Sequence, residues 1–261
     1  MTDRAVLAAT GPQARDFLQG LVTHDLAALK PGMGLYSALL SPQGKILFDF
    51  FIAEGDGALL IDCPLAARDG LLKKLRLYKL RARIEIEARE QLNVYAGLIG
   101  AASAVSFPDP RLGALPPRSI GAKAEMPAGL PGPDAYHEVR LALGVPEAAD
   151  FGFEKIFALD GGLDELRAVS FTKGCYVGQE LTARMKHRAT ARKRPYLVTA
   201  AQALPDIGTA IAVGTAEIGE IISTYGTEGF ALLRLDRLAE AQGPAMAEKI
   251  PVALIRPAWL G

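Results

Sequence analysis

The last quarter of the chain consists of short apolar segments that alternate with turn residues, and this pattern constrains the fold more than any other feature. The segments are RPYLVTA, TAIAV, EIGEIIST, GFALLRL and KIPVALI, and they lie between residues 194 and 255. Short strands at regular spacing with turns between them are typical of an all-β barrel or sandwich. Closing the strands into a barrel leaves no unpaired edge. We therefore predict a small antiparallel β-barrel over residues 191–261.

The residues before this segment combine helix and strand patterns. KILFDFFIA (45–53) and ALLIDC (58–63) flank the turn EGDG, which predicts a β-hairpin. Leucines recur at helical spacing in residues 66–79 and predict a helix. RARIEIEA (81–88) alternates strictly between apolar and charged residues, which predicts a strand that is buried on one face.

Two further features complete the expected organisation. Thr10 followed by Pro12 predicts the beginning of a helix. Seven prolines lie between Val105 and Asp134, a composition typical of a connector between two lobes. We expect one α+β region over residues 1–190, formed of either one lobe or two, followed by the barrel over residues 191–261.

Composition excludes several classes of protein. Lys plus Arg equals Asp plus Glu at 29 each, so no global charge attracts the chain to nucleic acid or membrane. No apolar run approaches the roughly 18 residues of a membrane span. The first residues, MTDRAVLAATGPQARDF, contain neither the apolar core of a signal peptide nor an Arg- and Ser-rich presequence, so we expect a cytoplasmic location.

The metal-ligating residue types are sparse. Cys63 and Cys175 are far apart in the sequence, and the three histidines do not cluster. This pattern argues against a disulfide scaffold and against a self-contained zinc or iron–sulfur site, which needs four ligands close together. We expect no permanent metal site.

The segment SFTKGCYVGQELTARMKHR (170–188) contains the residues best suited to catalysis or ligand binding, a cysteine close to a lysine and two glycines. Gly174 and Gly178 bracket Cys175, and glycines at this density indicate turns with positive φ or a backbone that another group approaches closely. The ammonium of Lys173 would favour the thiolate of Cys175, the form that attacks electrophiles and binds metals. The alternative is a cysteine buried in a tight turn, since free cysteine is among the most buried residue types.

KGCYVGQE resembles the signature K-G-C-[FYI]-x-G-Q-E of the YgfZ family, whose members share the folate-binding fold of the glycine-cleavage T-protein. The fixed positions are matched by Lys173, Gly174, Cys175, Gly178, Gln179 and Glu180, and the aromatic position by Tyr176. The longer match VSFTKGCYVGQELTAR looks most like the bacterial relatives of the mitochondrial iron–sulfur cluster assembly factor of this family. Weaker similarity extends over residues 31–52, 109–118, 140–151 and 229–236.

This resemblance implies a T-protein-like α+β fold, bound tetrahydrofolate and a role in iron–sulfur cluster assembly. It makes Cys175 and Lys173 the reactive pair, with Cys175 a metal ligand only transiently and together with a partner. The implied partners are an A-type iron–sulfur scaffold protein or client enzymes. The implied folate contacts are Asp49, Tyr176, Gln179, Glu180 and Arg184.

Two positions bear on the folate site directly. Asp49 has apolar neighbours on both sides and aligns with the second acid of a pair in T-protein, where such an acid faces the folate. Ala142 stands where T-protein has a Glu after its Arg-Leu pair, so a carboxylate expected near the pteridine is missing. Ordinary glycine cleavage is therefore disfavoured, although folate binding remains expected.

Three functions are compatible with these features. The first, which the cysteine signature favours, is a folate-binding accessory factor in iron–sulfur cluster assembly or repair. The second is a tetrahydrofolate-dependent aminomethyl or one-carbon transferase, in which Cys175 acts as nucleophile or acceptor. The third is a tRNA-modification accessory or folate-sensing protein. Six cations between Arg184 and Arg194 indicate a local anion-binding patch, but no nucleic-acid-binding motif accompanies them.

Overall fold

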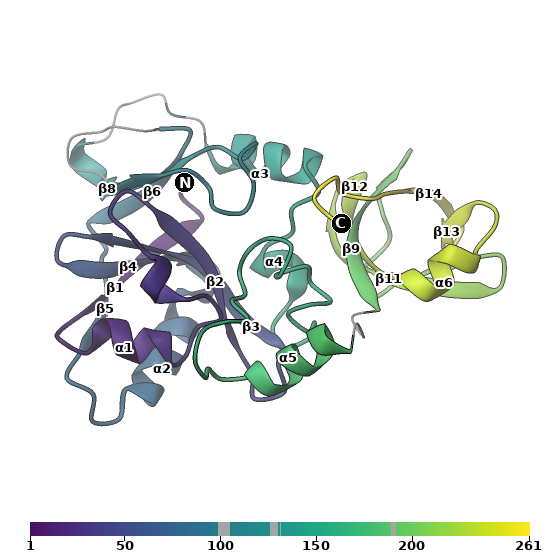
Figure 1. The fold of residues 1–261 in the computed structure, drawn as a ribbon. Helices are drawn as coiled ribbons and strands as arrows, with labels where there is room; N and C mark the ends of the chain where they lie inside the picture. Colours follow the sequence, from purple (N-terminus) through teal and green to yellow (C-terminus); the bar gives the residue numbers. More distant parts are fainter. Residues whose placement is uncertain (99–104, 126–129, 131, 189–191) are drawn as a thin grey trace.

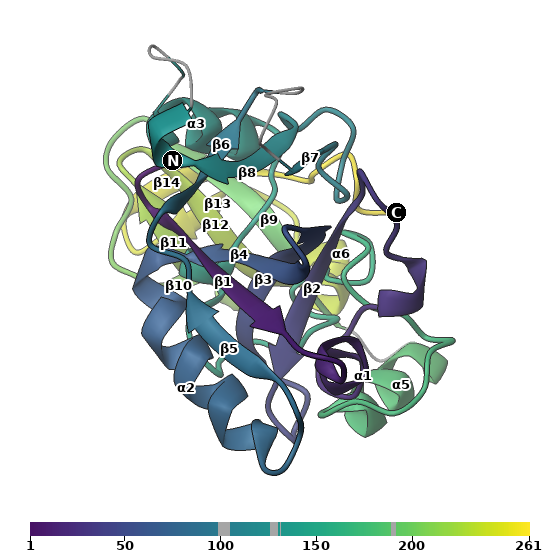
Figure 2. The same cartoon turned by 90° about the vertical axis from the view of Figure 1, so that its left-hand side faces the viewer.

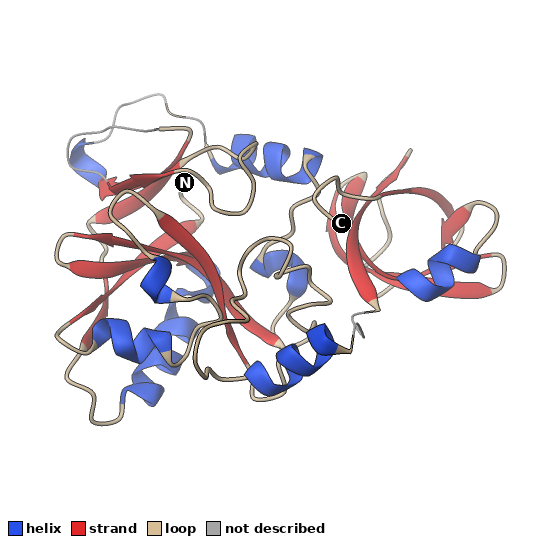
Figure 3. Cartoon of the chain, viewed as in Figure 1, coloured by secondary structure: helices blue, strands red, loops and turns tan. Residues whose placement is uncertain are grey.

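The fold combines two antiparallel sheets, a barrel and short helices. The structure is a computed structural model and describes residues 1–98, 105–125, 130, 132–188 and 192–261. The barrel lies at one end of the molecule and a five-stranded sheet at the other (Figure 1). Between them are α3 (Pro133–Ala142), α4 (Ala148–Phe151) and α5 (Gln179–His187), as Figure 3 shows. The predicted α+β class is confirmed.

The five-stranded sheet is antiparallel throughout. Its order is β2 (Gly34–Leu40), β3 (Ile46–Gly55), β4 (Ala58–Pro64), β1 (Arg4–Thr10) and β5 (Glu85–Ala88). One face buries Phe50 and Ile61 against α1 (Ala14–Gln19) and α2 (Arg68–Lys79). Figure 2 shows α2 alongside β5, and α1 beyond the end of β1. The other face carries Tyr36 and Phe51 toward the middle of the molecule.

The predicted hairpin over 45–53 and 58–63 is confirmed, because β3 and β4 pair antiparallel across a tight turn. The predicted helix over 66–79 corresponds to α2. The predicted strand over 81–88 is shorter than expected, because the backbone turns between residues 79 and 84. The Ala82 N–H donates to the Lys79 carbonyl and the Ile84 N–H to the Ala82 carbonyl, so the strand begins only at Glu85. Within β5 the side chain of Ile86 is buried and its neighbours Glu85 and Glu87 are exposed, as the alternation predicts.

The helix start predicted at Thr10 is wrong. Thr10 is the last residue of β1, and it pairs with Glu85 of β5. Its backbone therefore belongs to the sheet, and α1 begins later, at Ala14. Three short 3₁₀ helices complete this part of the chain, η1 (Leu26–Ala28), η2 (Leu65–Ala67) and η3 (Lys123–Glu125).

The connector predicted between residues 105 and 134 is also wrong where the structure describes it. Residues 99–104, 126–129 and 131 lie outside the described residues. A three-stranded antiparallel sheet forms from β6 (Leu92–Ala96), β8 (Arg118–Ala122) and β7 (Val105–Phe107), with β8 in the middle. The prolines at 108, 110, 116 and 117 lie in the loop between β7 and β8. Val94 and Ile120 pack this sheet onto the Tyr36 face of the larger sheet.

The predicted C-terminal barrel is confirmed. Its strands are β9 (Lys193–Ala200), β10 (Ala210–Val213), β11 (Ala216–Tyr225), β12 (Glu228–Arg234), β13 (Ala245–Ala247) and β14 (Ile250–Ile255), with α6 (Leu235–Glu240) after β12. They close in the order β10-β11-β12-β9-β14-β13, and every neighbouring pair is antiparallel. Alternate side chains such as Val198, Ile218 and Leu233 fill the interior.

Candidate functional site

The signature segment forms a turn that leads into α5, and its two glycines have different roles. Gly178 is the N-cap of α5 with φ 82°, and a Cβ there would lie 2.5 Å from the carbonyl oxygen of Ser41. Only glycine fits this close approach. Gly174 has no heavy atom within 4 Å of an ideal Cβ and no positive φ, so the tight backbone expected around both glycines exists only at Gly178.

Cys175 lies on the outside of this turn and Tyr176 on the inside. Cys175 is exposed, so the alternative of a cysteine buried in a tight turn is contradicted. Tyr176 is buried in the central apolar cluster, and burial raises the pKa of its hydroxyl to about 12. Cys63 provides the contrast within the same chain, because it is fully buried on β4 and burial raises the pKa of its thiol to about 12. Of these two thiols, only that of Cys175 is accessible to another molecule.

Lys173 anchors the turn to the N-terminal region. Its Nζ donates hydrogen bonds to the carbonyl oxygens of Gln19, Val22 and His24, at 2.6, 2.7 and 2.9 Å. An ammonium has three hydrogens, and these three carbonyls accept all of them. Burial lowers the pKa of Lys173 to about 8, and the carbonyl acceptors favour its charged form. Lys173 therefore has no hydrogen left for a direct bond to the Cys175 thiolate.

The remaining signature residues lie on α5. Gln179 is its first residue and is half-buried. Glu180 and Arg184 pair with each other at 2.6 Å on the exposed side of the helix. Most of the basic run predicted as an anion-binding patch is also paired internally, in the ion pairs Lys186–Asp164, Lys193–Glu220 and Arg194–Glu165. These pairs reduce the charge that the run offers to an external anion.

Asp49 lies in the middle of β3, away from the signature turn in the sequence and on a different element. Its Oδ2 accepts a hydrogen bond of 2.6 Å from the hydroxyl of Tyr36, and its buried Oδ1 has no hydrogen-bond partner among the residues that the structure describes. Burial, followed by the negative charge of Glu147, raises the pKa of Asp49 to about 6. A buried carboxylate oxygen without a donor is energetically costly, so this oxygen could accept a hydrogen bond from a ligand.

A buried charge network lies on the same face of the sheet as Asp49, and no periodic pattern in the sequence predicts it. Arg111 pairs with Asp109 and Glu147 at 2.7 Å each, and Arg118 pairs with Asp62 at 2.7 Å. The other members are Arg4, which pairs with Asp62 at 2.6 Å, and Tyr136, which contacts Arg111, Arg118 and Glu147. Although burial opposes ionisation, Arg111 and the other arginines hold the pKa of Glu147 well below its usual range. The Asp-Pro-Arg segment at residues 109–111 was the sequence signal for this network.

A second buried ion pair joins α3 and α4 to the barrel. Arg140 of α3 pairs with Asp150 of α4 at 2.8 Å. From β11 of the barrel, Ser223 and Tyr225 donate to the Oδ1 of Asp150 at 2.6 and 2.8 Å. Ala142, where a glutamate was expected, lies at the end of the same helix α3.

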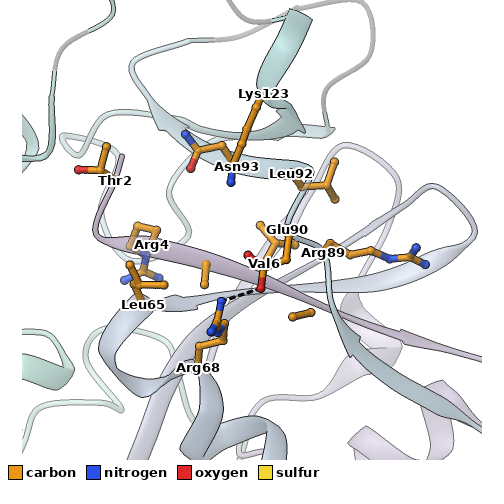
Figure 4. Close-up of a pocket in the computed structure, with 12 residues that line it drawn as sticks. Thr2, Arg4, Val6, Leu65, Arg68, Arg89, Glu90, Leu92, Asn93 and Lys123 are labelled. Atoms are coloured by element: carbon orange, nitrogen blue, oxygen red, sulfur yellow. Dashed lines mark hydrogen bonds and ion pairs between the residues drawn. The ribbon is translucent and has the colours of Figure 1, made fainter.

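Several cavities border these elements, and two of them adjoin β1 and β2 of the five-stranded sheet. A pocket of about 270 Å³ lies between β1, β6 and the start of α2, and its lining includes Arg68 and Glu90 (Figure 4). These two residues form an ion pair at 2.7 Å. A cavity of about 460 Å³ lies at the beginning of β2, with His24, Met33 and Asp109 in its lining. Neither cavity is lined by a residue of the signature turn.

Among the described residues, no group of three or more His, Cys, Asp or Glu side chains is arranged to hold a metal ion. No helix in the described part of the chain is long and apolar enough to cross a membrane.

Comparison with known proteins first defines the class to which this fold belongs. The structure of a glycine cleavage system aminomethyltransferase T from Bartonella henselae superposes on 99% of this chain and 84% of its own, with a TM-score of 0.73 at 16% sequence identity. Residues 192–261 match the family described as the CAF17 C-terminal beta-barrel domain. The chain therefore has an aminomethyltransferase T-like fold that ends in a CAF17-type barrel.

Sequence relatives then define the family. The chain is 32% identical to the human mitochondrial iron–sulfur cluster assembly factor IBA57, over 98% of this chain and 83% of that protein. It is 30% identical to the mouse protein of the same name, with the same coverage. The chain belongs to the IBA57 family, which confirms the resemblance seen in the signature.

These relatives correct the expected location. Both are named as mitochondrial proteins, which contradicts the cytoplasmic location expected from the first residues. That expectation is wrong because it was drawn from the lack of a recognisable presequence at the start of the chain, which does not determine a compartment.

Proposed function

We propose that this chain acts in iron–sulfur cluster assembly, the role named for its relatives. The observation that carries the proposal is the similarity to human IBA57 over 98% of the chain, and the exposed Cys175 in the KGCYVGQE motif supports it. The test is expression in cells that lack their own member of the family, with the protein delivered to the same compartment. Iron–sulfur enzyme activity should return. A folded chain at normal abundance that restores no activity would refute the proposal.

We further propose that Cys175 acts through its thiolate. Iron–sulfur clusters are usually held by several cysteine thiolates, so one exposed sulfur cannot hold a cluster alone. The other ligands would come from an A-type scaffold protein or from the client enzyme. Lys173 supports this role by fixing the turn that presents the sulfur, through its three carbonyl contacts.

We also propose that reduced folate binds on the Asp49 face of β3. Two observations support this, the T-like fold and the buried Oδ1 of Asp49, which could accept a hydrogen bond from a pterin N–H group. The cavity at the beginning of β2 has the size of a small-molecule site, but its lining includes neither Asp49 nor Tyr36, so the proposal rests on the fold and on Asp49 itself. In a titration of the purified protein, Asp49→Ala should weaken tetrahydrofolate binding by about 1–3 kcal/mol. Equal affinity in the variant would remove Asp49 from the site.

An accessory role without turnover is favoured over a one-carbon transferase. Ala142 occupies the place of the carboxylate that a T-protein carries near its pteridine, so a group expected in the transferase site is missing. In a folate-sensing protein, Cys175 would only stabilise the turn by packing against neighbouring side chains. The Cys175 side chain is exposed, so it does not have this packing role. The exposed thiol of Cys175 and the missing carboxylate at Ala142 are both compatible with a role in cluster assembly.

A further inference from the structure

A dense basic segment lies outside the site described above. Residues 73–83 contain six Lys and Arg and no acidic residue, although the whole chain has no net charge. The cations are Lys73, Lys74, Arg76, Lys79, Arg81 and Arg83, and they cover the second half of α2 and the turn into β5. Charges act over about 8 Å at physiological ionic strength, so a surface close to this corner experiences its local charge and not the average of the chain.

These cations are not neutralised by the protein itself. Among the described residues none of the six forms an ion pair, whereas Arg68, at the start of the same helix, pairs with Glu90 at 2.7 Å. Arg76 donates to the carbonyl oxygen of Ile86 at 3.1 and 2.9 Å, which fixes its side chain along β5. The exposed ammonium and guanidinium groups of Lys73, Arg81 and Arg83 face solvent.

Two leucines project from the middle of this basic segment. Leu77 is 68% exposed and Leu80 is 88% exposed, while Leu71 and Leu75 of the same helix are fully buried against the sheet. Leu77 follows Lys73 by one helical turn, so both lie on the outer side of α2. Leu80 ends the helix with a positive φ of 45°, which is uncommon for a bulky apolar residue. Figure 2 shows the turn between α2 and β5 at the lower tip of the molecule.

We propose that this basic corner, residues 73–83, docks on an anionic phospholipid surface, with Leu77 and Leu80 entering the interface and the cations contacting lipid phosphates. Leucines surrounded by Lys and Arg are the composition of segments that lie in a membrane interface. Protein interfaces are instead depleted in Lys. Non-specific binding to nucleic acid comes from contacts of Lys and Arg with phosphates, to which projecting leucines do not contribute. Charge complementarity therefore favours a lipid surface as the occupant.

The test is flotation of the full chain with vesicles of phosphatidylcholine alone and of phosphatidylcholine with phosphatidylglycerol. The protein should float with the anionic vesicles at low salt, detach at high salt and remain unbound with neutral vesicles. Lys73→Gln with Lys79→Gln should weaken binding by about fivefold for each cation removed. Leu77→Ser with Leu80→Ser should weaken it at constant charge, which a purely electrostatic contact would not show.

Matched controls lie elsewhere on the surface. Lys30→Gln with Lys249→Gln removes two exposed cations outside the corner, and Ile207→Ser removes an exposed apolar side chain near the barrel. These variants should float like the wild type, and all variants should keep its melting temperature because none of the changed side chains is buried. No flotation of the wild type, or equal loss in the controls and the corner variants, would overturn the proposal. Retention on a polyglutamate or RNA column without vesicle binding would also overturn it and assign the corner to a soluble polyanion.

Discussion

At the scale of single residues, the carboxyl group of Asp49 has a raised pKa in the folded protein. Burial and the charge of Glu147 raise its pKa to about 6, whereas the unfolded chain has the ordinary value near 3.8. Between these values the folded state binds a proton that the unfolded state has released, so the contribution of Asp49 to stability is lost as the pH rises through about 6. Asp49→Asn cannot ionise. It should raise the free energy of unfolding by about 3 kcal/mol at about pH 7.5, and by only about 1 kcal/mol at about pH 4.5.

Urea denaturation at the two pH values measures this difference. Asp56→Asn is the control, because Asp56 is exposed at the turn of the same hairpin and its φ of 53° suits asparagine. The control should change stability little at either pH. An Asp49→Asn variant that shifts stability equally at both pH values would show that Asp49 does not titrate as we infer.

The sequence was sufficient to select Cys175 and Asp49 but not to describe their surroundings. Cys175 was identified from a dense motif, and Asp49 from its apolar neighbours and its place in the resemblance. The role expected of Lys173, activation of the neighbouring thiol, was inferred from proximity along the chain. Its observed partners are carbonyls of residues 19–24, which no local pattern connects to residue 173.

At the scale of elements, Lys173 fixes the signature turn against the end of α1 and the segment that follows it. Lys173→Met keeps the apolar stem but leaves three carbonyl oxygens without their donor. Loss of these charge-assisted bonds should lower the free energy of unfolding by about 2–3 kcal/mol. Hydrogen exchange should accelerate in residues 170–178 and 19–24. Lys30→Met, at an exposed position, is the control, and equal exchange in the two variants would contradict the anchoring role.

Elements with a local pattern were predicted correctly, and those stabilised by distant charges were missed. The hairpin β3–β4 and the barrel strands show apolar repeats that indicate their structure directly. Strand β8 reads RSIGA and has two polar residues, Arg118 and Ser119, that are fully buried. From the sequence alone such polar residues are expected at the surface, because Arg is rarely buried without a partner. Its partner Asp62 is on β4, in another sheet.

At the scale of the whole molecule, the buried charge network joins the two sheets. The Oε1 of Glu147 lies 2.7 Å from Nη1 of Arg111, and its carboxylate also forms longer ion pairs with Arg4 and Arg118, at 3.7 and 3.6 Å. Glu147→Gln leaves these arginines buried with too little negative charge, so it should lower the free energy of unfolding by about 3–5 kcal/mol. Glu87→Gln breaks an exposed pair with Arg89 and should cost less than about 1 kcal/mol. Urea denaturation compares the two, and a similar small loss in both would contradict a structural role for the network.

The barrel could be predicted from the sequence, but the contacts that join it to the rest of the molecule could not. Its strands alternate regularly, whereas its junction depends on Asp150 accepting hydrogen bonds from Ser223 and Tyr225, which are more than seventy positions later in the chain. Pairings at such separation leave no periodic signal in a single sequence. The resemblance to a known family supplied the overall fold where patterns could not.

The central claim is that the exposed sulfur of Cys175 serves iron–sulfur cluster assembly. The most direct measurement is iron–sulfur enzyme activity in cells that lack their own family member and express Cys175→Ser, with Cys63→Ser as the matched control. Cys175→Ser should fold with the melting temperature of the wild type, because Cys175 is exposed, yet restore no activity, since a serine hydroxyl is a poor ligand for the metals that thiolates bind. Cys63→Ser should restore activity to the extent that it folds. A folded Cys175→Ser variant that restores full activity would contradict the account.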